Sequence, residues 1–142
     1  MDWKNKLRNA GYRITDAREQ MMDLLINTQT ALSPMQIHKA LAEQGSQMGL
    51  VSVYRNLAVL QENDLVCMVF APDGSAAYTA GGIGHHHHVL CQRCLNSASF
   101  EGCEGFADLI QEIEAQTQFK VQGHLLQFYG LCSECQKNEI HV

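Results

Sequence analysis

The 142-residue sequence has no long apolar run and only two prolines. A helix that crosses a bilayer needs about 18 or more consecutive apolar residues, so we expect no membrane span and no membrane partner. The opening residues, MDWKNKLRNAGYR, lack the apolar core of a secretory signal, and we therefore expect a cytoplasmic protein. Because 46% of the residues are hydrophobic, the composition is typical of a folded chain rather than a disordered one.

An excess of positive charge is also missing, since the formal net charge is -5. An acidic chain binds nucleic acid poorly unless its charges are segregated. Here they are: residues 1–62 carry seven Lys/Arg and six Asp/Glu, whereas residues 63–142 carry three and nine. If DNA is the partner, the first half must make the contact and the acidic second half must face away.

The first half has the pattern of short helices. Thr15 or Asp16 can cap a helix through AREQMMDLLI, and the Ser-Pro pair at 33–34 can open a second helix, PMQIHKALAEQ. Ser52 can cap a third helix, VYRNLAVLQEN, whose apolar residues have helical spacing. Two β-prone runs follow, LVCMVFA and SAAYTA, on either side of a Pro-Asp-Gly turn. Helices followed by a hairpin predict a winged helix-turn-helix over residues 1–79.

A second unit begins after the glycine-rich stretch AGGIG, which we interpret as a hinge over residues 80–84. HHHVLCQ and NSASFE have the pattern of strands, and GFADLIQEIEAQT has that of a helix. FKVQGHLLQFYGLC is expected to form one or two further strands. The fold class predicted for the whole chain is therefore α+β, with a small α/β domain over residues 85–142.

Two Cys-x-x-Cys pairs are the strongest chemical signal in the sequence. They are Cys91/Cys94 and Cys132/Cys135, and each pair can present two thiolates from one turn. Six cysteines in a cytosolic chain indicate metal ligands or redox groups more readily than disulfides. We therefore predict a four-cysteine structural zinc site, with a strand-helix-strand unit bringing the pairs together.

Four histidines precede the first pair, at positions 85–88. In a strand, alternate side chains share a face, so His86 and His88 point one way while His85 and His87 point the other. One interpretation is a solvated histidine-rich strand. The other takes His86 and His88 as ligands of a second, exchangeable metal, for which the available partners are Cys67, Glu101 and Cys103. His124 can join His85 and His87, although a lone histidine in an apolar strand is as often a core residue.

The motifs GYRITDAR, GLVSVYRNLAVLQENDLV, HHHHVLCQRC and YGLCSEC, in this order, resemble those of the ferric uptake regulator family of metal-dependent bacterial repressors. The resemblance covers nearly the whole chain. It implies an N-terminal winged helix joined by a hinge to an α/β dimerisation domain, and a homodimer that binds palindromic operator DNA when its regulatory metal is loaded. It implies neither an enzyme nor a small-molecule substrate.

The resemblance also assigns ligands. It implies that the four paired cysteines hold the structural zinc, and that His86 and His88 belong to the regulatory site. Cys67 falls where zinc-sensing members place a ligand, while Glu101 and Cys103 compete for the remaining position. The third, more variable site matches His85, His87 and His124.

Several positions depart from the iron-sensing pattern. Ala31 and Thr79 stand where iron sensors have a histidine and an acidic ligand, and Ala107 replaces a carboxylate of the third site. Thiolate with imidazole suits zinc, whereas iron(II) and manganese(II) favour more nitrogen and oxygen ligands. We therefore predict a zinc-sensing regulator with about two zinc ions per subunit. An iron-, manganese- or peroxide-responsive regulator of the same family remains the alternative.

The third predicted helix is expected to read the operator. Tyr54 and Arg55 are the first choices for base and phosphate contacts, although Tyr54 could instead lie in the core. The further candidates for DNA contact are Ser52, Asn56, Arg13, Thr15 and Arg18. FKVQGHLLQFYG supplies an apolar strand that can pair with its copy in a dimer.

An enzyme is the alternative from a different class, since zinc-stabilised thiol reductases also carry paired and spare cysteines. Such an enzyme needs a thiol of lowered pKa in an electropositive pocket. Cys103 lies between Glu101 and Glu104, which would raise its pKa. This alternative also gives the helical first half no role.

Overall fold

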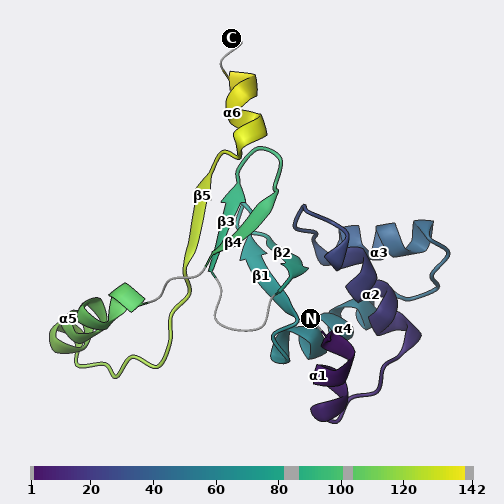
Figure 1. The fold of residues 1–142 in the computed structure, drawn as a ribbon, viewed down its shortest axis with the longest axis horizontal. Helices are drawn as coiled ribbons and strands as arrows, with labels where there is room; N and C mark the ends of the chain where they lie inside the picture. Colours follow the sequence, from purple (N-terminus) through teal and green to yellow (C-terminus); the bar gives the residue numbers. More distant parts are fainter. Residues whose placement is uncertain (1, 82–86, 101–103, 140–142) are drawn as a thin grey trace.

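The computed structural model describes residues 2–81, 87–100 and 104–139, which form a helical half and a second half built on a small sheet (Figure 1). The helical half contains α1 (Trp3–Asn9), α2 (Asp16–Ile26), α3 (Pro34–Glu43), α4 (Leu50–Glu62), β1 (Val66–Phe70) and β2 (Ala76–Ala80). The second half contains β3 (His87–Cys91), β4 (Ser97–Phe100), the 3-10 helix η1 (Glu104–Phe106), α5 (Ala107–Thr117), β5 (Gln127–Gly130) and α6 (Ser133–Glu139). The predicted winged helix-turn-helix and small α/β domain are confirmed.

The helix starts follow the predicted caps in two cases out of three. The Thr15 hydroxyl accepts a hydrogen bond from the Arg18 N–H at 3.3 Å, and Ser33 forms a capping box with Gln36 ahead of α3. The prediction that Ser52 caps the third helix is wrong. Gly49 is the N-cap residue of α4, and its carbonyl already accepts from the Val53 N–H at 3.1 Å, so Ser52 lies inside the first turn.

Two short helices were not predicted from the sequence. In α1, the Asp2 side chain accepts from the Asn5 N–H, and Trp3 and Leu7 are buried one turn apart. α6 begins between the two cysteines of the second pair, with Ser133 as its first residue. Both helices have seven residues, which is too short for a clear apolar period.

One dense core holds the helical half together. It contains side chains from all four helices and from the start of the wing: Trp3, Leu7, Met21, Met22, Leu25, Ile37, Leu41, Val53, Leu57, Leu60, Leu65 and Val66. The wing itself is the antiparallel hairpin β1–β2, in which Val66 pairs with Ala80 and Phe70 with Ala76. Gly74, at φ +85°, supplies the left-handed residue of the turn. The core thus fixes α4 against the wing.

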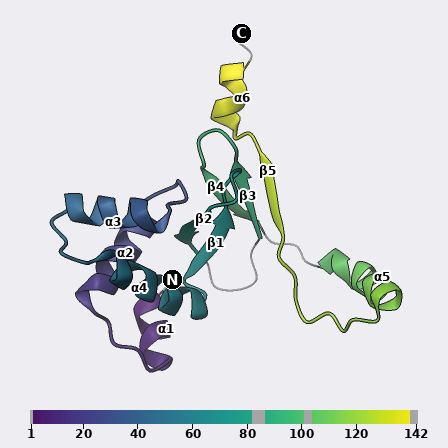
Figure 2. The same ribbon diagram turned by 180° about the vertical axis from the view of Figure 1, so that it is seen from behind.

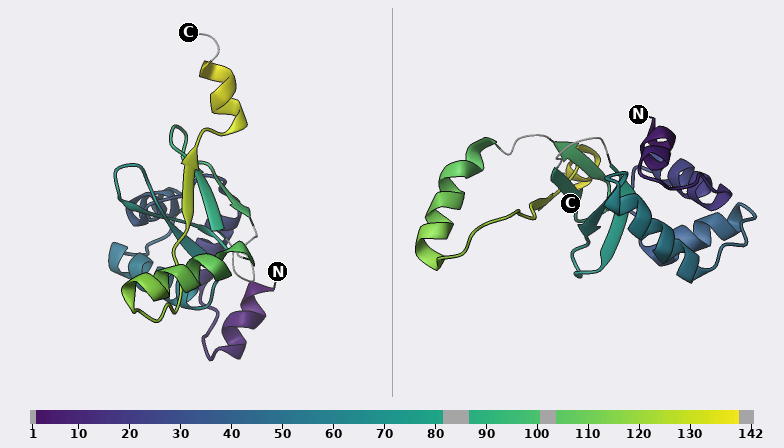
Figure 3. Two further views of the ribbon diagram at one scale, coloured as in Figure 1. Left: turned by 90° about the vertical axis from the view of Figure 1, so that its left-hand side faces the viewer. Right: turned by 90° about the horizontal axis from the view of Figure 1, so that it is seen from below.

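The second half has a three-stranded sheet of order β4-β3-β5. β3 pairs antiparallel with β4 and parallel with β5. Because parallel strands need a long crossover connection, the chain between β3 and β5 includes α5. Of the predicted strand or strands in FKVQGHLLQFYGLC, only Gln127–Gly130 is regular. Residues 118–126 carry the chain back from α5, which stands away from the sheet and from the helical half (Figures 2 and 3).

Candidate metal centres and DNA-binding surface

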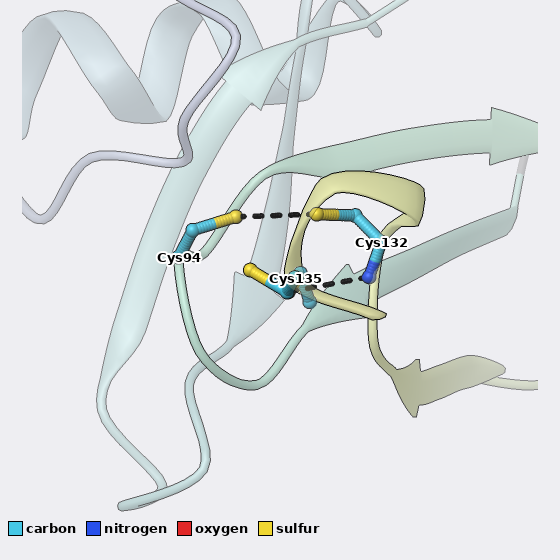
Figure 4. Close-up of side chains that lie close together, drawn as sticks. Cys94, Cys132 and Cys135 are labelled. Carbon is cyan, nitrogen blue, oxygen red and sulfur yellow. Dashed lines mark hydrogen bonds between the residues drawn. The ribbon is translucent and has the colours of Figure 1, made fainter. Parts of the chain in front are cut away.

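The four paired cysteines come together at the end of the sheet. The Sγ atoms of Cys91, Cys94, Cys132 and Cys135 all lie within 4.8 Å of one another. The distance between the Cys94 and Cys132 Sγ atoms is 3.7 Å, and Figure 4 shows these thiols converging with that of Cys135. A regular zinc tetrahedron with Zn–S bonds of about 2.3 Å has S–S edges of roughly 3.8 Å. The arrangement therefore fits one tetrahedral thiolate-bound metal ion.

The parallel pairing of β3 with β5 is what closes this site. In its register Cys91 lies beside Gly130, and the Gln92 N–H donates to the Gly130 carbonyl at 2.9 Å. Each pair lies at the end of one of these two strands. Cys91 is the last residue of β3 and Cys94 lies in the turn after it, while Cys132 lies just beyond β5. Cys135 then enters from the first turn of α6. The long separation in sequence is thus spanned by α5 and residues 118–126.

The electrostatics of the cluster favour a bound cation. The Cys132 N–H donates to the Cys91 Sγ at 3.4 Å, and this hydrogen bond is the main reason that the pKa of Cys91 falls to about 6. Burial beside the other thiols raises the pKa of Cys135 to about 12. Four adjacent thiolates repel one another unless a metal ion neutralises them, so metal binding must displace protons from this site.

The predicted regulatory ligands are only partly within the described residues. Cys67 is the second residue of β1, and a Cβ atom added to Gly81 would lie 2.9 Å from its Sγ, so this glycine leaves room for the thiol. Burial, and then the charge of Asp64, raise the pKa of Cys67. His88 is buried on β3. The predicted ligands His86, Glu101 and Cys103 lie outside the described residues. Among the residues that are described, the group of potential ligands that could hold a metal is the four paired cysteines, and it includes neither Cys67 nor His88.

The other face of β3 brings together two of the three residues predicted for the third site. The Nε2 atoms of His87 and His124 are 3.4 Å apart. Two imidazole nitrogens of a tetrahedral zinc site with Zn–N of about 2.0–2.1 Å have nearly the same separation. Phe100 and Phe106 lie against the His87 ring, with centroids 5.7 and 6.5 Å away. His85, the third predicted member, lies outside the described residues.

A network of side chains links the start of α2 to α4. Arg18 donates from Nε to the Asn56 Oδ1 at 3.1 Å and from Nη1 to the Arg13 carbonyl at 2.6 Å. Its guanidinium also lies 5.5 Å from the centroid of the Tyr12 ring. The Asn56 amide donates in turn to the Ser52 carbonyl at 2.9 Å. The network holds Arg18 in place, and Tyr12 is a member that the sequence analysis missed, although it directly precedes the predicted Arg13.

The exposed face of α4 carries the residues predicted to contact the operator. Tyr54 is 52% exposed rather than part of the core, and Arg55 is exposed beside it. On the opposite face Val53, Leu57 and Leu60 are buried in the core of the helical half. The helix thus presents an aromatic side chain and a guanidinium to solvent from a rigid support, which is what contacts to base edges and phosphates need.

Comparison with known proteins identifies the family to which this chain belongs. A sequence model of the ferric uptake regulator family matches residues 9–129. The chain belongs to the ferric uptake regulator family. It is 33% identical over 135 residues to the peroxide operon regulator of Bacillus subtilis, covering 95% of this chain and 92% of that protein. It is 31% identical to the ferric uptake regulation protein of Campylobacter upsaliensis, covering 94% and 86%.

Solved structures of ferric uptake regulator proteins share the fold. A zinc uptake regulator complexed with zinc and DNA has a TM-score of 0.78 at 22% identity, covering 97% of this chain and 93% of that one. The ferric uptake regulator of Helicobacter pylori has a TM-score of 0.61 at 23% identity, covering 94% and 89%.

Family membership settles the class of function. The chain is a metal-responsive, DNA-binding transcriptional regulator and not an enzyme, so the thiol reductase alternative is dropped. Its four-cysteine cluster can hold a metal ion. Across the parts of the chain that the structure describes, no helix is long and apolar enough to cross a membrane.

Proposed function

We propose that this family member senses zinc in the cytoplasm and, when loaded, represses zinc uptake genes by binding a palindromic operator as a homodimer. The regulatory zinc is held by Cys67, His86, His88 and either Glu101 or Cys103, and a second zinc occupies the four-cysteine site. The observation that carries the choice of zinc is the half-buried thiol of Cys67 in the wing. A thiolate combined with imidazole favours tetrahedral zinc over iron(II) or manganese(II).

The position of Cys67 supports a mechanism of control. It belongs to β1 of the winged helix, whereas His88 belongs to β3 of the second half. An ion bound by both would fix the orientation of the two halves and hence the spacing of the two α4 helices in a dimer. A two-fold dimer reads a two-fold operator only when that spacing matches the half-sites. Full switching of such an equilibrium needs a difference in binding of about 5.5 kcal/mol between the two states.

The surface of the second half supports the homodimer. Every residue of α5 is exposed or half-buried, and large apolar side chains lie open on α5 and on the segment that follows. They include Leu109, Ile113, Phe119 and Leu125, and Phe128 of β5 is exposed as well. An apolar helix face without a covering layer is unfavourable in water, and a second copy of the chain would bury it.

On α4, Tyr54 and Arg55 make the base and phosphate contacts in this proposal. Arg13, Thr15 and Arg18 contact phosphates at the start of α2. The hydrogen bonds of Asn56 give it mainly the role of positioning Arg18, with Ser52 next to it. His85, His87 and His124 form the third metal site.

The test is operator binding measured by fluorescence anisotropy while buffered free zinc, iron(II) or manganese(II) is raised in protein that keeps its four-cysteine metal. We expect zinc at sub-nanomolar free concentration to switch binding on, and Cys67→Ser to abolish the switch. Met68→Leu, an exposed neighbour on the same strand, is the matched control and should behave as the wild type.

Other outcomes separate the alternatives. A response to iron(II) or manganese(II) that survives Cys67→Ser would replace zinc by the metal that acts and remove Cys67 from the site. A response to peroxide in the iron-loaded protein would place the chain with the peroxide regulators. No response to any metal would refute metal-dependent operator binding.

A further inference from the structure

The two halves touch through a small cluster of apolar side chains, apart from the chain that connects them. Ala31, Val69 and Ala77 come from the helical half and its wing, and Leu90 comes from β3. All four are buried, and Leu95 packs against them. The contact is too small to hold two domains rigidly by burial alone, so the polar contacts at its edges determine the orientation.

Gln127 supplies the first polar contact. Its Oε1 accepts from the Phe70 N–H at 2.8 Å, and its Nε2 donates to the Phe70 carbonyl at 2.8 Å. A side-chain amide that bonds both groups of one residue imitates a rung of a β-ladder and therefore fixes direction as well as distance. Phe70 ends β1, the strand that carries Cys67, while the backbone of Gln127 pairs with His88.

Asn96 supplies the second contact. Its Oδ1 accepts from the Thr30 hydroxyl at 3.1 Å, and next to it the Ala31 N–H donates to the Leu95 carbonyl at 3.2 Å. The carbonyl of Asn96 also accepts from the Cys91 N–H at 2.9 Å. The turn that holds the first cysteine pair is thereby connected to the chain between α2 and α3.

We propose that Gln127 and Asn96 are positioning residues, which hold the winged helix at the orientation that the operator requires. The Gln127 contact is made to Phe70, next to Val69 of the cluster, and the Asn96 contact is made to Thr30, next to Ala31, so together they oppose rotation as well as separation of the halves. The inference rests on the proposed function, because it assigns to Gln127 the transmission of the regulatory metal's effect from β3 to β1. Without the contact between Gln127 and Phe70, metal binding would change the orientation of α4 less.

Gln127→Met tests this inference, because methionine keeps the length of the side chain and loses both hydrogen bonds. Gln44→Met is the matched control, since Gln44 is exposed at the end of α3, outside the surfaces assigned to the operator and to the dimer. Operator affinity is measured by anisotropy at low and at saturating buffered zinc. We expect the zinc-dependent gain in affinity to fall about tenfold in Gln127→Met, the size expected for losing one to two neutral hydrogen bonds, and to stay unchanged in Gln44→Met.

A second variant separates positioning from folding. Gln127→Glu can still accept from the Phe70 N–H, but it cannot donate to the carbonyl, so we expect at least the loss seen with methionine. Metal content, dimer mass and melting temperature should stay those of the wild type in both variants. An unchanged zinc-dependent gain, a tighter operator complex, or an equal loss in Gln44→Met would overturn the inference.

Small-angle X-ray scattering distinguishes failure of this inference from failure of the proposed function. The measurement uses the zinc-loaded protein without DNA. We expect Gln127→Met to broaden the distribution of interatomic distances relative to wild type and Gln44→Met. If no metal changes operator binding in the wild type, the proposed function fails, yet this broadening still tests the contact. An unchanged distribution would show that Gln127 does not hold the two halves.

Discussion

The two halves of this regulator are stabilised in different ways. The helical half buries twelve side chains in one cluster that draws on all four helices and the start of the wing. In the second half α5 contributes no buried residue along Ala107–Thr117, all of which the structure describes. There the two strands that lead to the cysteine pairs are joined by a ladder and by four converging thiols. Burial of apolar surface thus folds the first half, whereas in the proposed homodimer metal binding and association complete the second.

The difference matches the roles of the halves. In the proposed function α4 reads the operator and needs a rigid support in every metal state, and the apolar core beneath it gives that support. If the second half forms the proposed dimer, it can leave apolar surface open because a second copy covers that surface. Its stability is then linked to metal and to protein concentration.

Metal removal should have the largest effect on stability, and only the second half should lose its structure. Structural zinc contributes about 10–16 kcal/mol in zinc-finger peptides, which is comparable with the whole stability of a domain. We expect stripping with a strong chelator, or Cys132→Ser, to abolish the dimer while most of the helical circular dichroism signal remains. Restored zinc should reverse the chelation but not the substitution. Loss of the entire helical signal would show that the halves fold as one unit.

The next largest effect should be the difference in unfolding free energy between two leucine truncations, one in each half. Leu57 of α4 is 1% exposed, whereas Leu109 of α5 is 47% exposed. We expect Leu57→Ala to lower the free energy of unfolding by about 2–5 kcal/mol and Leu109→Ala to change that of the isolated subunit by only about 0.5 kcal/mol. Urea titration of dilute protein checks both values. Equal losses would mean that α5 is packed within its own subunit.

The smallest effect concerns the open surface of the second half. Leu125 is 93% exposed, and we expect Leu125→Ala to weaken the dimer about tenfold, or by about 1.4 kcal/mol, because a partner copy buries this side chain. Sedimentation equilibrium gives the dissociation constant. Met35→Ala removes a side chain that is 68% exposed on the helical half and should leave the dimer unchanged. A dimer unaffected by Leu125→Ala would place the interface elsewhere.

Local signals in the sequence predicted much of the fold. The capping residues Thr15 and Ser33 and the Pro-Asp-Gly turn act within a few residues of the chain, so their consequences could be inferred without the structure. Ser52 was a wrong cap because the glycine at 49 offers no side-chain signal, although its backbone takes the N-cap position.

The sequence by itself determined the winged-helix order, the metal chemistry of the two cysteine pairs and the family, because spacing and residue type are sufficient for these. Only the tertiary structure decided that His87 lies against His124, that Gly81 leaves room for the Cys67 thiol, and that Gln127 holds Phe70. These contacts join residues whose nearness depends on strand register and on the orientation of the two halves. Both are set by the packing of the whole chain, so no short stretch of sequence encodes them.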